Sequence, residues 1–155
     1  MSATDERQFV DTNVLVYAHD TSAGEKHTRA STLLQALWRP GSGCLRVQIL
    51  QEFYVTITAR VPTPLAPDTA RERIAELVAW IVHRPTVDDV LDALAIARRY
   101  DVAFWDAMVT QSATQLGCAR IWSEDLNAGQ RYGSVRIENP FAPGGTAEVP
   151  APSAS

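Results

Sequence analysis

Apolar residues along the chain follow two spacings: short continuous runs, and longer segments in which they recur every three or four positions. Four short runs rich in β-prone residues predict strands at 7–11, 44–47, 119–122 and 135–138. The helical spacing predicts helices at 25–37, 48–60, 68–78, 86–100 and 104–116. Because strands alternate with helices, we predict an α/β fold with a central parallel sheet and helices on both faces.

Capping and turn residues mark where several of these helices begin or end. Asp68 is a candidate N-cap, the segment 86–89 (TVDD) resembles a capping box, and Gly117 stands where the last helix should stop. The secondary structure of two segments is left unassigned. The apolar run 14–17 is too short to classify, and 80–83 either finishes a helix or forms a strand.

The composition indicates a single globular domain with a substantial core. The 155 residues are 46% hydrophobic and 21% charged, and a chain of this length can fold without disulfides or a structural metal. We place the domain at residues 1–141. Residues 142–155 are dominated by Pro, Gly, Ala and Ser, and we expect this segment to be disordered.

The cysteines and apolar runs exclude several classes of protein. Cys44 and Cys118 are far apart and form no C-x-x-C motif, so neither a zinc ribbon nor a redox pair is expected. No apolar run reaches the roughly 20 residues that span a bilayer, and the polar segment 1–8 lacks the features of a signal peptide. We therefore expect a cytoplasmic protein with reduced thiols and no membrane partner.

The formal net charge of −4 restricts how the chain can bind nucleic acid. Proteins that bind it by neutralising phosphates are usually basic, so the charge argues against a simple groove-binding module. It does not argue against a nuclease that uses bound cations, because a metal ion reverses the electrostatics of a carboxylate cluster.

Four acidic residues stand where predicted strands end or helices begin. Asp11 directly follows the first strand, and Asp125 lies just past the end of a later one. Asp106 lies in the first turn of one predicted helix, and Glu52 lies one turn into another. Functional sites of parallel sheets lie beyond the carboxyl ends of the strands. We therefore expect these four side chains to open onto the same end of the sheet.

Carboxylates gathered in this way suit the metal-assisted hydrolysis of a phosphodiester. One or two divalent cations activate the attacking water, offset the phosphate charge and stabilise the leaving group, and Mg²⁺ prefers oxygen ligands. The three histidines lack the spacing of a zinc site. The sequence also has no glycine-rich phosphate loop and no G-x-S-x-G motif.

Each acid also has a plain structural interpretation. Asp11 and Asp125 suit helix caps and turns, and Asp106 suits the positive end of a helix dipole. Glu52 flanks the apolar stripe of its helix, which favours a solvated surface position. Glu124 is a neighbouring rival for Asp125. Each signal is weak alone, and the shared placement at strand ends favours the functional interpretation.

Four segments together resemble the PIN-domain family, and specifically the VapC-type toxins of bacterial toxin–antitoxin pairs. They are FVDTNVL at 9–15, QEFY at 51–54, FWDAM at 104–108 and SEDLNAG at 123–129. The first and third are fairly specific together, and the second is weak by itself. The resemblance extends from Phe9 to about Phe141, which is nearly the whole predicted domain.

The resemblance implies a PIN-like α/β/α sandwich and a Mg²⁺- or Mn²⁺-dependent endoribonuclease. It implies that the metal ligands or water activators are Asp11, Glu52, Asp106 and Asp125. Asn13 would be a polar group supporting Asp11, and Ser123 a hydroxyl that orients Asp125 or a bound water. The family places an acid two positions after a Ser or Thr, which favours Asp125 over Glu124.

Other side chains near these segments are candidates for binding an RNA substrate. The arginines that can position its backbone are Arg29, Arg46, Arg60, Arg98 and Arg99, although solvated helix faces explain most of them equally well. Phe104 and Trp105 directly precede Asp106, and we expect both to pack against the core rather than to stack on a base.

The resemblance also implies protein partners. One is a cognate antitoxin that inserts an Arg or Lys into the acidic pocket. The other is a second copy in a homodimer, to which the apolar segments 14–17 and 33–38 can contribute. The main alternative is a non-catalytic binding domain on the same fold. The presence of all four acids argues against it, because a non-catalytic copy would be free to lose one of them. A haloacid-type phosphatase is a weaker alternative, because Asn13 stands at the third position of its D-x-D motif.

Overall fold

The computed structural model describes residues 6–143, which form a six-stranded sheet with helices on both faces. The strands are β1 (Gln8–Val10), β2 (Gly43–Arg46), β3 (Ile81–His83), β4 (Arg120–Trp122), β5 (Arg131–Tyr132) and β6 (Val135–Glu138). The helices are α1 (Thr12–His19), α2 (Glu25–Trp38), α3 (Val47–Ala59), α4 (Pro67–Leu77), α5 (Val87–Tyr100) and α6 (Phe104–Gln115), and the 3₁₀ turn η2 is Thr21–Ala23.

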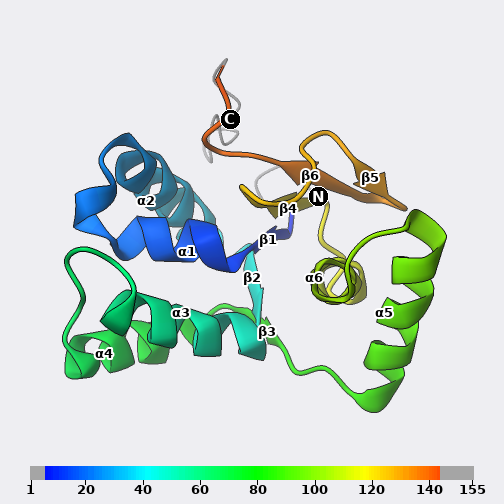
Figure 1. The fold of residues 1–155 in the computed structure, drawn as a ribbon, viewed down its shortest axis with the longest axis horizontal. Helices are drawn as coiled ribbons and strands as arrows, with labels where there is room; N and C mark the ends of the chain where they lie inside the picture. The colour runs from blue at the N-terminus through cyan, green and yellow to red at the C-terminus, as the bar shows by residue number, and fades with distance from the viewer. Residues whose placement is uncertain (1–5, 144–155) are drawn as a thin grey trace.

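The strand order is β3-β2-β1-β4-β6-β5, and every pairing is parallel except that of β5 with β6. Figure 1 shows α1 to α4 on one side of the strands and α5 and α6 on the other. The chain builds outward from β1 to β3, then crosses back to place β4 on the other side of β1. This reversal is the topological switch point at which α/β sheets bind ligands. The predicted α/β/α sandwich is confirmed.

The core lies between the sheet and its helices. The strands β1 and β2 are buried along their whole length, as is typical of parallel strands covered on both faces. The largest fully buried side chains come from β1, β2, β4 and β6 and from the inner faces of α1 to α4: Trp122, Phe9, Phe53, Leu15, Leu33, Leu37, Leu45, Ile49, Ile57, Leu77, Ile121 and Ile137. In the described part of the chain, none of the helices is long and apolar enough to cross a membrane.

The structure decides the two segments that the sequence left open: 14–17 lies inside α1, and 80–83 contributes the strand β3. One predicted helix start needs correction. Asp68 is not the N-cap of α4: Pro67 is the first helical residue after the extended Ala66, and Asp68 lies in the first turn. Proline has no N–H to lose there, so the helix begins without a side-chain cap. The strand β5 was not predicted from the sequence, and the segment 144–155 of the predicted disordered tail lies outside the described residues.

A buried polar network joins β3 to α5 and α6. His83 contacts Ser112 Oγ through Nδ1 at 2.7 Å and Asp89 Oδ2 through Nε2 at 3.1 Å. Asp89 also accepts hydrogen bonds from Gln111 Nε2 at 2.9 Å and, in the predicted capping box, from Thr86 N at 2.8 Å. The network fixes α5 and α6 relative to the end of β3.

Replacing Asp89 with alanine is expected to lower the free energy of unfolding by at least about 2 kcal/mol, because the Thr86 N–H loses its acceptor in the capping box while His83 and Gln111 lose a buried partner. Chemical denaturation measures the change. The control is Asp88→Ala, which removes an exposed acid from the same turn and should cost less than about 1 kcal/mol. Equal losses in the two variants would show that the network does not stabilise the fold.

Candidate active site

A cavity of about 530 Å³ lies at the carboxyl ends of β1, β2 and β4, between α1, α3 and α6. The structure brings all four predicted acids to its wall: Asp11, Glu52, Asp106 and Asp125. They come from four separate segments, so the cavity exists only in the folded chain. Their chemical roles stay a prediction at this point.

Asp11 caps α1 and also faces the cavity. Its Oδ1 accepts the Thr12 backbone N–H at 2.8 Å, and its Oδ2 accepts the Ser123 hydroxyl at 2.8 Å. Burial raises the pKa of the Asp11 carboxyl, and the charges of Asp125 and Glu52 raise it further, while the two hydrogen bonds oppose this. Asp11 can therefore be both a helix cap and a candidate metal ligand. The cap fixes the position of a carboxylate whose negative charge is disfavoured until a cation approaches.

Ser123 and Asn13 fix the loop that carries Asp125. The Ser123 hydroxyl, fully buried, donates to Asp11 and accepts the backbone N–H groups of Asp125 and Leu126, both at 3.2 Å. Asn13 Nδ2 donates to Asp125 Oδ2 at 2.9 Å, and Asn13 Oδ1 accepts the Glu124 N–H at 3.2 Å. The two residues expected to support the acids thus connect β1 to the loop after β4.

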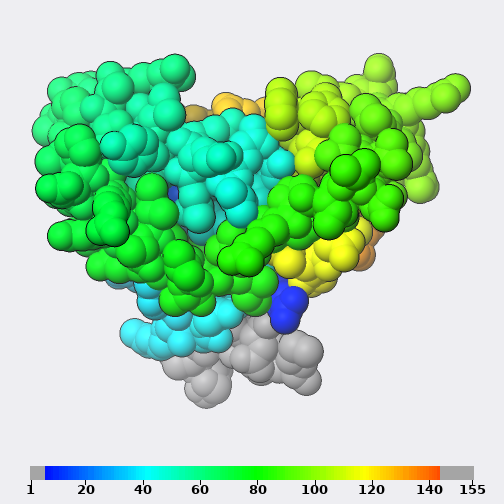
Figure 2. Space-filling view, turned by 90° about the horizontal axis from the view of Figure 1, so that it is seen from below, coloured from blue at the N-terminus to red at the C-terminus, as the bar shows by residue number. Residues whose placement is uncertain are grey.

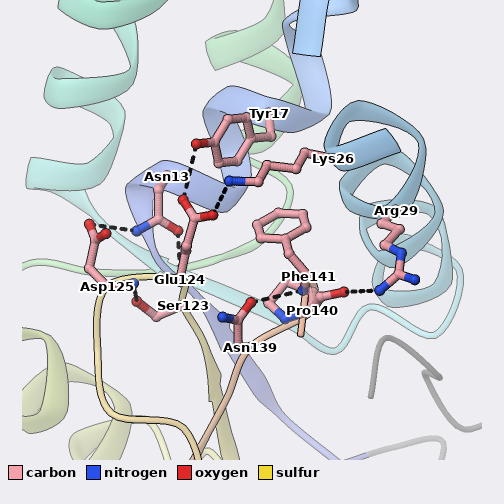
Figure 3. A network of polar contacts seen from close by, with 10 residues as sticks. All are labelled: Asn13, Tyr17, Lys26, Arg29, Ser123, Glu124, Asp125, Asn139, Pro140 and Phe141. Atoms are coloured by element: carbon pink, nitrogen blue, oxygen red, sulfur yellow. Dashed lines mark hydrogen bonds and ion pairs between the residues drawn. The ribbon is translucent and has the colours of Figure 1, made fainter. Parts of the chain in front are cut away.

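The neighbours Glu124 and Asp125 point in different directions, as Figure 3 shows. Glu124 accepts a hydrogen bond from the Tyr17 hydroxyl at 3.0 Å and forms an ion pair with Lys26. The ring of Phe141 packs edge-on against Tyr17, with ring centroids 5.2 Å apart. Asp125 lines the cavity and Glu124 does not. The geometry therefore places Asp125, and not its rival, among the cavity acids.

Glu52 and Asp106 complete the acidic wall from two helices. Glu52 Oε1 accepts the Thr12 hydroxyl at 2.6 Å, and Glu52 Oε2 accepts Gln48 Nε2 at 3.2 Å. Glu52 is exposed to solvent, as its helix position predicted, yet it faces the cavity. Asp106 lies in the first turn of α6, where burial and then the charge of Asp125 raise the pKa of its carboxyl.

This donor set fits an oxygen-coordinated divalent cation by its chemistry. The four acids supply carboxylate oxygens, which Mg²⁺ prefers, and water can fill the remaining positions. Within residues 6–143, however, no three acidic, histidine or cysteine side chains are grouped closely enough to hold an ion as they lie. Instead, oxygens of three of the acids accept hydrogen bonds from neighbouring polar side chains: Thr12, Ser123, Asn13 and Gln48. A cation would have to compete with these hydrogen bonds and draw the carboxylates inward.

The raised pKa of Asp106 predicts a gain in stability when its charge is removed. Because the pKa is higher in the folded than in the unfolded chain, ionisation destabilises the fold as the pH rises above about 4. Asp106→Asn should therefore raise the melting temperature at neutral pH in EDTA, and by less in acid. Mn²⁺ should stabilise the wild type more than the variant. A lower melting temperature for Asp106→Asn in EDTA would contradict this account.

Two of the five candidate arginines, Arg46 and Arg60, line the cavity. Arg46 is 5% exposed, and burial lowers the pKa of its guanidinium against the raising effect of Glu52 and Asp11. Arg29 donates instead to the carbonyl oxygens of Pro140 and Ala142. The remaining two, Arg98 and Arg99, lie in the last turn of α5 and do not line the cavity.

The expectation that Trp105 packs into the core is wrong. Its side chain is 57% exposed at the edge of the cavity. Thr12 and Gln48, which hold Glu52, were not singled out from the sequence. The only available signal was their position, one residue after Asp11 and one helical turn before Glu52.

Comparisons with known proteins agree with this architecture. The model of the PIN domain family matches residues 9–132. The fold is similar to that of VapC20 from Mycobacterium tuberculosis, described as a toxin that cleaves the sarcin-ricin loop: TM-score 0.58, 18% identity, covering 74% of this chain and 86% of that one. A toxin–antitoxin complex from Klebsiella pneumoniae contains a similar chain: TM-score 0.62, 16% identity, covering 83% and 94%.

A third similar structure is VapBC2 from Rickettsia felis bound to a DNA fragment of its promoter, with TM-score 0.59, 11% identity and coverage of 85% and 97%. A search among curated proteins finds no matching sequence. At these identities the structures establish a shared fold, while the family model spans most of the chain. The chain therefore belongs to the PIN-domain family.

Proposed function

We propose that this chain is a divalent-metal-dependent endoribonuclease and the toxin of a toxin–antitoxin pair. The observation that carries the proposal is the convergence of Asp11, Glu52, Asp106 and Asp125 on one cavity at the switch point of a PIN-domain sheet. The similar VapC20 is described as cleaving the sarcin-ricin loop, which supports RNA as the substrate.

The four acids would hold Mg²⁺ or Mn²⁺, which would activate water and offset the charge on the phosphate. The chain's own residues prepare this site. Ser123 and the Thr12 N–H orient the Asp11 carboxylate, and Asn13 orients Asp125. A solvent-facing carboxylate such as Glu52 can accept the proton of the attacking water as the new P–O bond forms. As the P–O bond to the ribose oxygen breaks, that leaving oxygen takes up a proton from solvent water, to which the cavity is open. Arg46 and Arg60 add positive charge for the phosphate.

The proposal is tested by incubating the purified chain with transfer RNA, structured RNAs and unstructured RNAs, in Mg²⁺, Mn²⁺ or EDTA. Discrete cleavage products in metal and none in EDTA are expected. Cleavage that persists in EDTA would contradict the metal requirement. No cleavage of any RNA, together with no Mn²⁺ binding by calorimetry, would favour the alternative of a non-catalytic binding domain.

An antitoxin partner follows from the same proposal. The similar Klebsiella pneumoniae and Rickettsia felis structures are complexes of a toxin with its antitoxin or of VapBC2 with DNA. An acidic cavity can accept a guanidinium or ammonium group from a partner, through charge-assisted hydrogen bonds. Inhibition of RNA cleavage by a protein encoded beside this chain would test the pairing. A cytoplasmic location, where RNA and antitoxin meet, stays a prediction.

A homodimer also stays a prediction, and core packing was the default expectation for the two apolar segments that could contribute to it. The segments 14–17 and 33–38 mostly belong to the core, and only Trp38, 42% exposed, remains a large exposed apolar residue there. Exposed apolar side chains follow the outer face of α5 instead, at Val87, Leu91 and Leu94. Sedimentation equilibrium of the wild type and of Leu91→Glu would show whether a dimer forms and whether it uses this helix.

A further inference from the structure

A second groove adjoins the acidic cavity and has the opposite chemistry. It has a volume of about 590 Å³ and lies between the start of α3 and the segments that lead into α5 and α6. Figure 2 views the side on which the cyan start of α3 adjoins these green and lime segments. Arg46, Gln48 and Trp105 line both hollows, so the groove continues the cavity. We call it the Trp105 groove.

The Trp105 groove is lined by two arginines, two glutamines and apolar side chains, and by no carboxylate. Arg84 is exposed on its wall and has no ion-pair partner within residues 6–143. Arg46 is almost fully buried between the two hollows, and its Nε has no hydrogen-bond partner there. In a chain of net charge −4, this is a local positive surface directly beside the acids.

Trp105 offers a flat aromatic face at the junction of the two hollows. More than half of its side chain is exposed, so the face of the indole is accessible to a ligand. The Phe104 ring packs edge-on against it, with centroids 4.9 Å apart at 66°, and limits its orientation. Asp106 follows directly in the chain, so a base lying on Trp105 would be next to the acidic cavity.

We propose that the Trp105 groove binds the unpaired nucleotide next to the scissile phosphodiester, with its base stacked on Trp105 and its phosphate beside Arg84. Proteins that bind single-stranded RNA combine exposed aromatic rings with positive charge in this way. A double helix would keep its bases stacked on one another and leave Trp105 uncovered. The inference rests on the proposed ribonuclease function for its biological meaning, but binding can be measured without cleavage.

The test is the affinity for a short fluorescein-labelled single-stranded RNA, measured by fluorescence anisotropy in EDTA so that metal-dependent cleavage is absent. Trp105→Ala is expected to weaken binding about 5- to 100-fold, and Trp105→Phe much less, because stacking survives. Arg84→Ala should weaken binding and reduce the slope of log affinity against log salt by about 0.7, the value for one phosphate contact on a single strand.

Two matched controls remove the same groups elsewhere. Trp38→Ala removes another exposed indole, and Arg71→Ala another exposed arginine, and neither residue lines the groove. Both should bind RNA like the wild type, and each variant's melting temperature checks its fold. Equal affinities for Trp105→Ala and the wild type, or equal binding of a duplex, would overturn the proposal. So would an absence of RNA binding by the wild type.

The proposed function and the groove can fail separately. RNA binding that depends on Trp105 and Arg84, from a protein that cleaves no RNA in Mn²⁺, would support the groove and overturn the nuclease. Metal-dependent cleavage with unchanged affinity in Trp105→Ala and Arg84→Ala would support the nuclease and overturn the groove. That second result would make a protein segment the better candidate for covering Trp105.

Discussion

Asp11→Asn is expected to slow RNA cleavage at least about 100-fold while leaving the fold intact. Asparagine matches aspartate in shape and is as good an N-cap, so α1 should still begin at Thr12. The variant loses a negative charge on the cavity wall, beside Glu52 and Asp125. It also loses one of two acceptor oxygens, so the asparagine amide can keep the Thr12 N–H as a donor partner but no longer accepts the Ser123 hydroxyl as well. The rate is measured under single-turnover conditions, where product release does not limit it.

The matched control for Asp11→Asn is Asp92→Asn, which neutralises an exposed acid on α5. Its cleavage rate should stay within about threefold of the wild type, because exposed substitutions away from the site are nearly neutral. A folded Asp11→Asn variant that cleaves RNA as fast as Asp92→Asn would remove Asp11 from the proposed metal site.

Asp125→Asn is expected to reduce cleavage at least about 100-fold, whereas Glu124→Gln should reduce it less than about threefold. The two acids are neighbours in sequence, but only Asp125 lines the cavity. Glutamine at position 124 can still accept the Tyr17 hydrogen bond and loses only a partly exposed ion pair with Lys26. The two variants lie in the same loop, each removes one negative charge, and both are measured in the same assay.

The reverse ranking, with Glu124→Gln the slower enzyme, would mean that the loop turns over when substrate or metal binds. Equal and large losses in both variants would instead indicate that the Lys26 ion pair positions the loop. Circular dichroism and melting temperatures distinguish these outcomes from simple unfolding.

Much of the fold follows from the sequence because the buried strands are short apolar runs between amphipathic helices. The strands β1, β2, β4 and β6 were all anticipated within one or two residues. The two-residue strand β5 has no period of its own and exists only by pairing with β6. The start of α4 was misplaced because Pro67 occupies the first helical position and no side-chain cap is used.

The acids of the site were predictable because the carboxyl ends of β1 and β4 must meet at one edge of the sheet. The groups that orient these acids were not predictable. Glu124 points away from the cavity because it accepts a hydrogen bond from Tyr17 and pairs with Lys26, both about a hundred residues earlier in the chain. Trp105 is exposed because of how α6 packs against its neighbours, and a hydrophobic residue beside an acid does not reveal this in the sequence.

If the four cavity acids gather a divalent cation for RNA hydrolysis, metal binding and catalysis must rise together. Mn²⁺ is titrated into metal-free protein, and bound Mn²⁺, by electron paramagnetic resonance, and the single-turnover rate of RNA cleavage are measured on the same samples. Occupancy and rate are expected to increase in parallel, and Asp106→Asn should weaken both. Cleavage without bound Mn²⁺, or full Mn²⁺ binding by Asp106→Asn, would contradict this expectation.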